Sequence, residues 1–342
     1  NLGRTGVPVS MLCLGCMNFG GPTPEAESFD MIDRALDAGI NFLDTANVYS
    51  RGVSEMIVGK ALQRNGKRDQ IVLATKVHGR MDDDNLLAYG NNRRHIIEQC
   101  EASLKRLQTD HIDLYQIHRP QSDMPIDETL RALDDLVTSG KVRYIGTSTF
   151  AAWQVMESLW IAKELNLNRF VTEQPPYHLL DRSIERELIP FAQTHGLAVL
   201  PWSPLARGFL TGRYQRGEDI PADSRLARDN KMPNPAFQKR TQQHFSDMAY
   251  NVLDAIVALA EEKNVSIAQV ALAWVARQPG VTSPIIGPRT MSHLEDNLGA
   301  LDVTFSEDDY AQIDAVAPPE QAIVPYYHGR LIDFKSSQFR WL

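Results

Sequence analysis

The chain of 342 residues is 43% hydrophobic and 23% charged, which is typical of a globular protein with room for one large domain or two smaller ones. Its formal net charge of −8, with no basic run, argues against nucleic acid or an anionic membrane as a partner. No apolar run reaches the ~20 residues that a membrane-spanning helix requires.

Through the first half of the chain, short apolar segments alternate with amphipathic ones at the periods of strands and helices. Ser54 is placed to cap the second helix, and Gly140 to end the fourth. The expected strands are Val9–Leu14, Asn41–Asp44, Ile71–Lys76 and Ile112–His118, and the expected helices are Glu25–Ala38, Ser54–Gln63, Arg94–Leu107 and Asp127–Thr138.

The second half continues the alternation but interrupts it with a long polar segment. The expected strands are Val142–Ser148, Phe170–Gln174, Leu197–Trp202 and Thr282–Ile286. The expected helices are Ala152–Leu165, Ile184–Thr194, Asp247–Lys263, Ser266–Arg277 and Ser292–Ala300. Residues 78–92 and 204–243 are too long for plain connectors, so we expect loops that act as lids.

Eight strand–helix units in one chain predict a (β/α)8 TIM barrel, which is an α/β fold. We expect a single domain over residues 1–342, with long loops on the rim of the barrel. The segment after Pro318 is expected to be irregular, and it carries Tyr326, Tyr327, Phe334, Phe339 and Trp341. The main alternative is a doubly wound open sheet, which normally has fewer strands and a glycine-rich fingerprint after the first.

Three of the expected strands end on residues that carry chemistry, namely Asp44, Lys76 and His118. Side chains alternate along a strand, so each of these shares a face with inward apolar residues. In a barrel the strand ends meet at the C-terminal rim, where barrel enzymes keep their sites. Tyr49 follows in the loop, and the chain must turn at residues 45–48 to bring its phenol back over the strand end.

Each of these four residues also has a purely structural interpretation. Asp44 could cap the following turn, Tyr49 could be a half-buried surface aromatic, Lys76 could extend to solvent, and His118 could be an ordinary strand-end histidine. Their convergence at one rim favours a catalytic interpretation over four separate structural ones.

Three cysteines, Cys13, Cys16 and Cys100, and a start unlike a signal peptide are typical of a reduced, cytoplasmic protein. Cys13 and Cys16 have the spacing of a metal or redox half-site, but no second cysteine or histidine pair completes it, so we expect no metal. The sequence has no GxGxxG or Walker A motif and no Tyr-x-x-x-Lys at Tyr49. A nucleotide would therefore be bound by the barrel rim.

Several segments in chain order resemble the aldo-keto reductases, NADPH-dependent barrel oxidoreductases. The resemblance rests on residues 44–49 (DTANVY), 74–76 (ATK), 116–118 (QIH), 140–146 (GKVRYIG), 201–205 (PWSPL), 208–212 (GFLTG), 284–287 (PIIG) and 294–298 (LEDNL). The segments around Pro204 and Gly212 are similar both to bacterial reductases and to the cytoplasmic β subunits of potassium channels.

The resemblance implies a catalytic tetrad of Asp44, Tyr49, Lys76 and His118. A phenol is too weak an acid at neutral pH, and a nearby ammonium such as that of Lys76 lowers its pKa. Asp44 would hold that ammonium, Tyr49 would donate a proton to the substrate carbonyl oxygen, and His118 would orient the same oxygen.

The resemblance also implies where NADPH would bind. Ser148 and Gln174 would bond the carboxamide and Trp202 would stack on the nicotinamide, and two positions depart from the family's usual residues, namely Thr149 for asparagine and Asp296 for glutamate. The full set of expected cofactor-binding residues is Met17, Asp44, Ser148, Thr149, Gln174, Trp202, Ser203, Leu205, Gly208, Arg213, Gly287, Arg289, His293, Asp296 and Asn297. Ser203 to Arg213 would surround the pyrophosphate, Arg289 and His293 would take the 2′-phosphate at a helix N-terminus, and Asp296 and Asn297 would hold the adenine.

Two classes of function remain open on the sequence. The first is a carbonyl reductase acting on a small aldehyde or ketone, with Met17–Phe19, both long loops and the C-terminal segment deciding the substrate. The second is an NADPH-binding auxiliary subunit that acts mainly through a protein partner. An oligomer is compatible with either, and a metal-dependent barrel hydrolase lacks ligands.

Overall fold

The computed structural model describes residues 1–233 and 235–327. Within them, eight parallel strands form one sheet in the order β7-β6-β5-β4-β3-β2-β1-β8. The strands are β1 (Cys13–Gly15), β2 (Phe42–Asp44), β3 (Val72–Val77), β4 (Ile112–Ile117), β5 (Val142–Ser148), β6 (Phe170–Gln174), β7 (Ala198–Val199) and β8 (Ile285–Ile286). Bridges from Val199 to Val281 and from Trp202 to Ile285 join the two ends of the sheet. The sheet is therefore closed, and the expected (β/α)8 barrel is confirmed.

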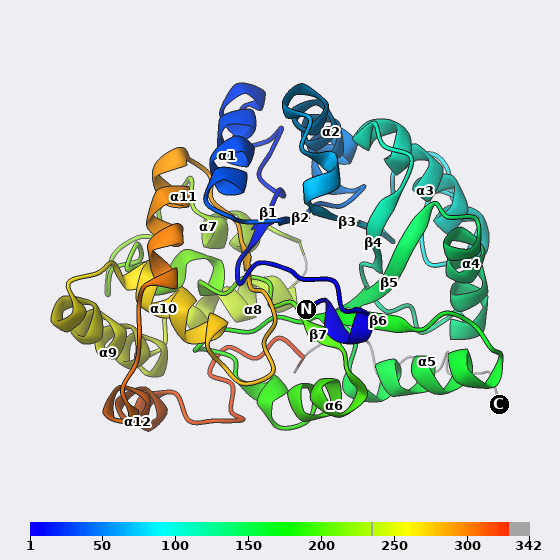
Figure 1. Cartoon of the computed structure of the whole chain (residues 1–342). Helices are drawn as coiled ribbons and strands as arrows, with labels where there is room; N and C mark the ends of the chain where they lie inside the picture. The colour runs from blue at the N-terminus through cyan, green and yellow to red at the C-terminus, as the bar shows by residue number, and fades with distance from the viewer. Residues whose placement is uncertain (234, 328–342) are drawn as a thin grey trace.

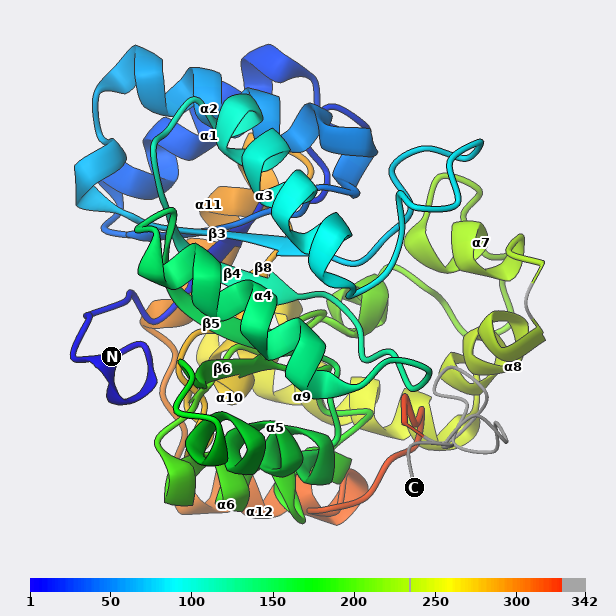
Figure 2. The same cartoon turned by 90° about the vertical axis from the view of Figure 1, so that its right-hand side faces the viewer.

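Helices surround this sheet on its outer side (Figure 1). They are α1 (Glu25–Asp37), α2 (Val53–Asn65), α3 (Arg93–Leu107), α4 (Ile126–Thr138), α5 (Ala152–Glu164), α6 (Leu188–His195), α7 (Arg225–Asn230), α8 (Pro235–His244), α9 (Asp247–Lys263), α10 (Ile267–Ala276), α11 (Met291–Leu298) and α12 (Glu307–Val316). Short 3-10 turns are η1 (Gly3–Thr5), η2 (Tyr49–Gly52), η3 (Arg68–Gln70), η4 (Ser183–Glu185), η5 (Ala206–Thr211) and η6 (Gly299–Leu301). Figure 2 shows α7, α8 and the loop between β3 and α3 at the same end of the barrel.

The apolar core has two layers, one inside the barrel and one between the strands and the helices. Phe42 and Ala74 belong to the inner cluster, whereas Leu43 and Leu73, their neighbours in sequence, pack in the outer cluster beneath the helices. This is the alternation expected of a strand, and it directs Asp44 into the barrel on the same side as Phe42.

The first strand is shorter than expected, because it begins at Cys13 rather than Val9. The amide of Ser10 donates to the side chain of Asn41 at 2.7 Å. The backbone at Ser10 is therefore bonded to a side chain and not to a neighbouring strand, and pairing between strands begins only at Cys13. Ser54 does not cap α2, whose N-cap is Gly52. The Ser54 hydroxyl instead donates to the carbonyl of Cys16 at 2.7 Å and connects the first turn of α2 to the residue that follows β1.

The expected helix Ile184–Thr194 is divided into η4 and α6. Pro190 lies in the first turn of α6, where its missing amide is tolerated, but its ring would clash with a helix running through from residue 184. The expected helix Ser292–Ala300 is also shorter, because α11 ends at Leu298 and η6 follows.

The polar segment 204–243 was expected as a loop, and that prediction is wrong, because it contains η5, α7 and most of α8. Ser224 caps α7 by accepting from the amide of Ala227. Helix α12 was not expected either, although Ser306 and Asp309 form a capping box there. The chain from Pro318 to Tyr327 contains no helix or strand, as expected, and Phe334, Phe339 and Trp341 lie outside the described residues.

Candidate functional site

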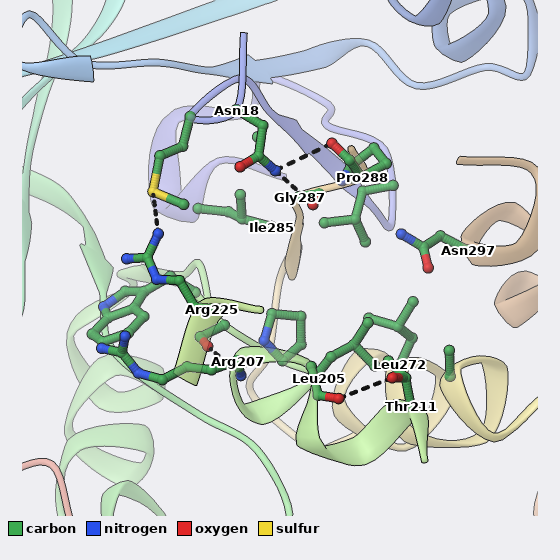
Figure 3. A pocket seen from close by; sticks show the side chains of 18 of the residues that line it. Asn18, Leu205, Arg207, Thr211, Arg225, Leu272, Ile285, Gly287, Pro288 and Asn297 are labelled. Carbon is green, nitrogen blue, oxygen red and sulfur yellow. Dashed lines mark hydrogen bonds between the residues drawn. The ribbon is translucent and has the colours of Figure 1, made fainter. Parts of the chain in front are cut away.

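A pocket of about 1560 Å³ opens at the C-terminal ends of the strands (Figure 3). This exceeds the ~300–1,000 Å³ common for small-molecule sites, and it has room for a dinucleotide together with a substrate. All the residues expected at the site line this pocket except Lys76, which lies fully buried below it.

Lys76 is the centre of a buried polar cluster at the floor of the pocket. Its ammonium donates to a carboxylate oxygen of Asp44 at 2.5 Å, to the carbonyl of Thr45 at 2.8 Å and to the hydroxyl of Tyr49 at 3.3 Å. All three hydrogens therefore have an acceptor. Burial alone would lower the pKa of Lys76, but the negative charge of Asp44 and the contact with Tyr49 outweigh it, so the pKa lies above its ordinary value.

The second oxygen of Asp44 is held by two glutamines. The side-chain amides of Gln116 and Gln174 donate to it at 3.1 and 3.0 Å. The carboxylate is thus satisfied on both oxygens and cannot turn away from Lys76. The sequence placed Gln116 on the inner face of its strand but did not assign it this role.

Tyr49 reaches the strand end through a tight turn, as expected. Its amide donates to the carbonyl of Ala46 at 3.1 Å, and the next two residues, Ser50 and Arg51, have positive φ values of 47° and 52°. Non-glycine residues in this region carry strain of about 1–3 kcal/mol each, and such strain clusters at functional sites. The turn places the Lys76 ammonium 4.9 Å from the centre of the Tyr49 ring.

His118 follows β4 directly and completes the group. Its ring meets that of Tyr49 edge-on, with centroids 5.6 Å apart. Burial, followed by the charges of Arg119 and Lys76, holds the pKa of His118 well below its usual value. The imidazole is therefore neutral at physiological pH, so it can donate a hydrogen bond to a carbonyl oxygen without carrying charge.

The residues expected to bond a carboxamide already contact one another. The hydroxyl of Ser148 donates to the backbone carbonyl of Gln174 at 3.0 Å, and Thr149 accepts from Arg119 at 2.9 Å. Trp202 lies beside them and meets the Tyr326 ring edge-on, with the two ring centroids 5.0 Å apart. Thr149, the departure from the family's asparagine, thus serves Arg119 in this structure.

Two of the expected phosphate ligands meet at one acidic residue. Arg213 forms an ion pair with the Asp223 carboxylate at 2.5 Å, and Arg289 donates to the Asp223 backbone carbonyl at 3.1 Å. The hydrogen bond from Arg213 lowers the pKa of Asp223. Arg213 and Asp223 both belong to segment 204–243, so the bond from Arg289 is the one that connects this segment to the Gly287 turn.

The far end of the pocket is formed by the turn at Gly287 and the start of α11. Asn18 donates to the carbonyls of Gly287 and Pro288 at 3.0 and 3.2 Å (Figure 3). Thr290 caps the helix by accepting from the amide of His293 at 3.3 Å. A Cβ at Gly287 would meet only the Asn18 amide at 3.8 Å, so the turn leaves space in the pocket.

Helix α11 also carries the residues expected at an adenine. Asp296 accepts from the side chain of Gln269 at 3.0 Å, and Asn297 is almost fully buried at the pocket wall. The amide of Met291 is occupied by the carboxylate of Glu27 at 3.1 Å. One of the free amides expected to favour an anion at this helix terminus is therefore already bonded.

Several pocket residues were not recognised in the sequence. The most prominent is Arg207, which is largely buried and paired with Asp229. A lone arginine in a segment taken for a loop gives no signal of burial. Others that line the pocket and were assigned no individual role include Arg119, Arg225, Arg240 and Tyr326.

Residues 1–233 and 235–327 hold neither a grouped set of metal ligands nor a membrane-spanning helix. No three His, Cys, Asp or Glu side chains in these ranges are grouped as ligands for a metal ion. No helix in the same ranges combines the length and apolar character needed to cross a bilayer.

Comparison with known proteins is consistent along nearly the whole chain. Residues 11–318 match the model of the aldo/keto reductase family. An uncharacterized oxidoreductase of Bacillus subtilis, YrpG, is 41% identical over 93% of this chain and 95% of its own length. A probable voltage-gated potassium channel subunit beta of rice (Oryza sativa subsp. japonica) is 38% identical over 89% and 90%. Versiconal hemiacetal acetate reductase of Aspergillus parasiticus is 35% identical over 93% and 96%.

Proposed function

Because the chain belongs to the aldo/keto reductase family and is an oxidoreductase, we propose that it reduces aldehydes or ketones to alcohols with NADPH, with Tyr49 as proton donor. The observation that carries the proposal is the contact between the buried Lys76 ammonium and the Tyr49 hydroxyl at 3.3 Å. Members of this family generally use a nicotinamide cofactor. When bound, that cofactor supplies the hydride that the carbonyl carbon accepts.

The residues of the chain fit a nicotinamide dinucleotide. The pocket runs from Trp202 at the catalytic group to Asn297 at α11, and Figure 3 shows Arg207 and Asn297 on its two sides. Arg213 and Arg289 provide two cations between these ends, and Gly287 leaves open space. Ser148 and Gln174 would hold the carboxamide, and Ser203, Leu205 and Gly208 the pyrophosphate. Met17, Thr149, His293 and Asp296 would complete the cofactor contacts.

The catalytic roles follow from charge. Lys76 is held as an ammonium by Asp44, so it stabilises negative charge that develops on the Tyr49 oxygen as the phenol gives up its proton. Neutral His118 donates a hydrogen bond to the same carbonyl oxygen and orients it. As hydride reaches the carbon and the Tyr49 proton reaches the oxygen, the carbonyl becomes an alcohol and the cofactor is oxidised.

NADPH rather than NADH is proposed because Arg289 and His293 lie at the expected 2′-phosphate position. Arg289 lines the pocket beside the start of α11, and His293 lies in the first turn of that helix. A guanidinium and a helix N-terminus both favour a dianion over a neutral hydroxyl.

The direct test is turnover by the purified protein. A panel of aldehydes and ketones is incubated with NADPH, and loss of the reduced cofactor is followed by its absorbance. Reduction of at least one carbonyl, abolished by Tyr49→Phe, is expected. Cofactor binding without turnover of any carbonyl would instead favour the auxiliary-subunit function, which is suggested by the name of the rice relative.

A further inference from the structure

A cluster of three arginines and one carboxylate lines the pocket next to Trp202. Arg207 and Arg225 share Asp229, because Arg207 pairs with one of its carboxylate oxygens and Arg225 lies 3.6 Å from the other. Figure 3 shows the side chains of Arg207 and Arg225 close together on one side of the pocket. Both oxygens of Asp229 are therefore occupied by Arg207 and Arg225, and neither pairs with the third arginine, Arg240.

Arg240 belongs to α8 and is only 6% exposed, yet it lines the pocket. Among the described residues, neither of its terminal nitrogens has a hydrogen-bond partner. Its guanidinium instead lies over two rings, 5.2 Å from the centre of Phe237 and 5.0 Å from that of Tyr326. A buried charge without hydrogen bonds is costly, so its presence at a pocket wall indicates a ligand that supplies them.

The position of Arg240 relates it to the reaction centre. The Tyr326 ring that Arg240 covers contacts Trp202 at 5.0 Å, and the guanidinium of Arg119 lies 5.9 Å from the Trp202 ring. Arg119 in turn follows His118 in the chain. Arg240 is thus linked to Trp202 through a single ring, that of Tyr326.

The contacts of Arg240 differ from those of the arginine at the expected phosphate end. Arg240 lies over the rings of Phe237 and Tyr326, whereas Arg289, at the Gly287 turn, donates to the backbone carbonyl of Asp223 at 3.1 Å. The two arginines therefore line different parts of the pocket wall.

We propose that Arg240 binds an anionic group on the substrate, a carboxylate or a phosphate ester, so that the preferred substrates are aldehydes or ketones with a negative charge distant from the carbonyl. This inference rests on the proposed carbonyl reduction. A guanidinium matches both anions through its fork of donors. Phe237 and Tyr326 form an apolar wall for the part of the substrate that joins the anion to the carbonyl.

The first experiment compares substrates that differ only in charge. Wild-type protein and NADPH are given para-formylbenzoate, para-formylphenyl phosphate or the neutral methyl para-formylbenzoate. We expect kcat/KM for at least one anion to exceed that for the ester by ~10-fold or more, mainly through KM, because a site built for a polar group discriminates strongly. The anion that shows the preference identifies the group. Equal values for all three substrates would overturn the proposal.

The second experiment assigns that preference to Arg240. In Arg240→Met the ratio of anion to ester should fall toward one, and in Arg240→Lys, which keeps the charge but not the fork, it should fall part of the way. Lys239→Met removes an exposed charge from the adjacent residue and should keep the ratio. If Arg240→Met does not fold, as judged by its melting curve, the Arg240→Lys ratio decides. A ratio unchanged in a folded Arg240 variant would overturn the proposal.

Binding separates this inference from the proposed function. Calorimetry with para-(hydroxymethyl)benzoate, the matching phosphate and the methyl ester requires no turnover. If Arg240→Met weakens the affinity for an anion by ~10-fold but the protein reduces no carbonyl, the anion site is supported and the proposed function is overturned. Carbonyl reduction together with anion binding that does not depend on Arg240 would support the proposed function and overturn the anion site. A weaker affinity for NADPH in Arg240→Met, with the substrate ratio intact, would place the cofactor phosphates at Arg240 and overturn the proposal.

Discussion

In the proposed function, the four residues Asp44, Tyr49, Lys76 and His118 are where single side chains decide the chemistry. Asp44, Lys76 and His118 were predictable because each sits at the end of a parallel strand and faces inward, so the barrel brings them to one rim. Arg240 could not be predicted. Its burial depends on Tyr326, more than eighty positions away, which covers its guanidinium, and no local pattern reveals that contact.

At Tyr49, we predict that Tyr49→Phe lowers kcat by at least ~10²-fold, the scale of general acid catalysis. The affinity for NADPH should barely change, because the phenol faces the substrate. Tyr310→Phe, on α12 outside the pocket, is the matched control and should keep normal turnover. Steady-state kinetics with a cofactor titration measure both quantities, and a Tyr49→Phe protein with near-normal kcat would remove Tyr49 from its role.

For the buried pair, we predict that Lys76→Met abolishes activity and lowers the free energy of unfolding by ~3–5 kcal/mol, because Asp44 remains buried without its cation. Lys60→Met removes an exposed ion pair with Glu25 and should cost no more than ~1 kcal/mol. Urea unfolding of both variants compares them. A fully stable and active Lys76→Met protein would show that the pair is needed neither for catalysis nor for stability.

At the scale of elements, the strands were predictable because their apolar runs are short and bounded by glycine and proline. The helices of segment 204–243 were not, since α7 and α8 have few apolar residues and fold against the rim. The signal for α7 was a single capping serine, Ser224. Lids of this kind depend on contacts with other elements, so their local sequence says little.

The lid and α11 meet at Arg289, and this contact leads to the coenzyme prediction. Arg289→Ala should raise the dissociation constant for NADPH by ~10-fold or more and leave NADH nearly unchanged, because a charge-assisted bond is worth ~1.5–3 kcal/mol. As a control, Arg34→Ala removes an exposed ion pair between Arg34 of α1 and Glu295 of α11, and it should change the affinity for neither coenzyme. Fluorescence titration measures all four constants. Equal weakening of both coenzymes by Arg289→Ala would mean that Arg289 does not read the 2′-phosphate.

At the scale of the whole molecule, closure of the barrel was predictable from the count of strand–helix units, whereas the lengths of the strands that close it were not. Strands of four to seven residues were expected throughout, yet β7 and β8 have two residues each. Neighbouring side chains and proline positions such as Pro201 and Pro284 limit the ladder there, and propensity alone does not weigh such effects.

The stability of the whole chain should depend on Glu173, a buried acid of β6 whose pKa is raised by burial from 4.5 to about 8. A raised folded-state pKa means that the folded protein binds the proton more tightly, so this group's contribution to stability is lost as pH rises from about 4.5 to about 8.

Glu173→Gln should remove that loss and stabilise the protein above pH 8 by roughly 2–4 kcal/mol relative to its effect at low pH. The amide can replace the acid, because the Thr147 hydroxyl can donate to the carbonyl of Thr172 and accept from the N–H of the new glutamine side chain. Urea unfolding across this pH range tests the slope, and parallel pH profiles for the two proteins would refute the assignment.

The seam between β7 and β8 has a thermodynamic consequence. Few ladder bonds hold it, among them the amide of Ile285 to the carbonyl of Pro201 at 2.8 Å, and the same stretch carries Trp202 and Gly287 at the pocket. A ligand that touches both sides of the seam binds only the closed form, so its binding free energy is added to that of closure. The junction at which the sheet closes is thus the one that a ligand bound across it would stabilise.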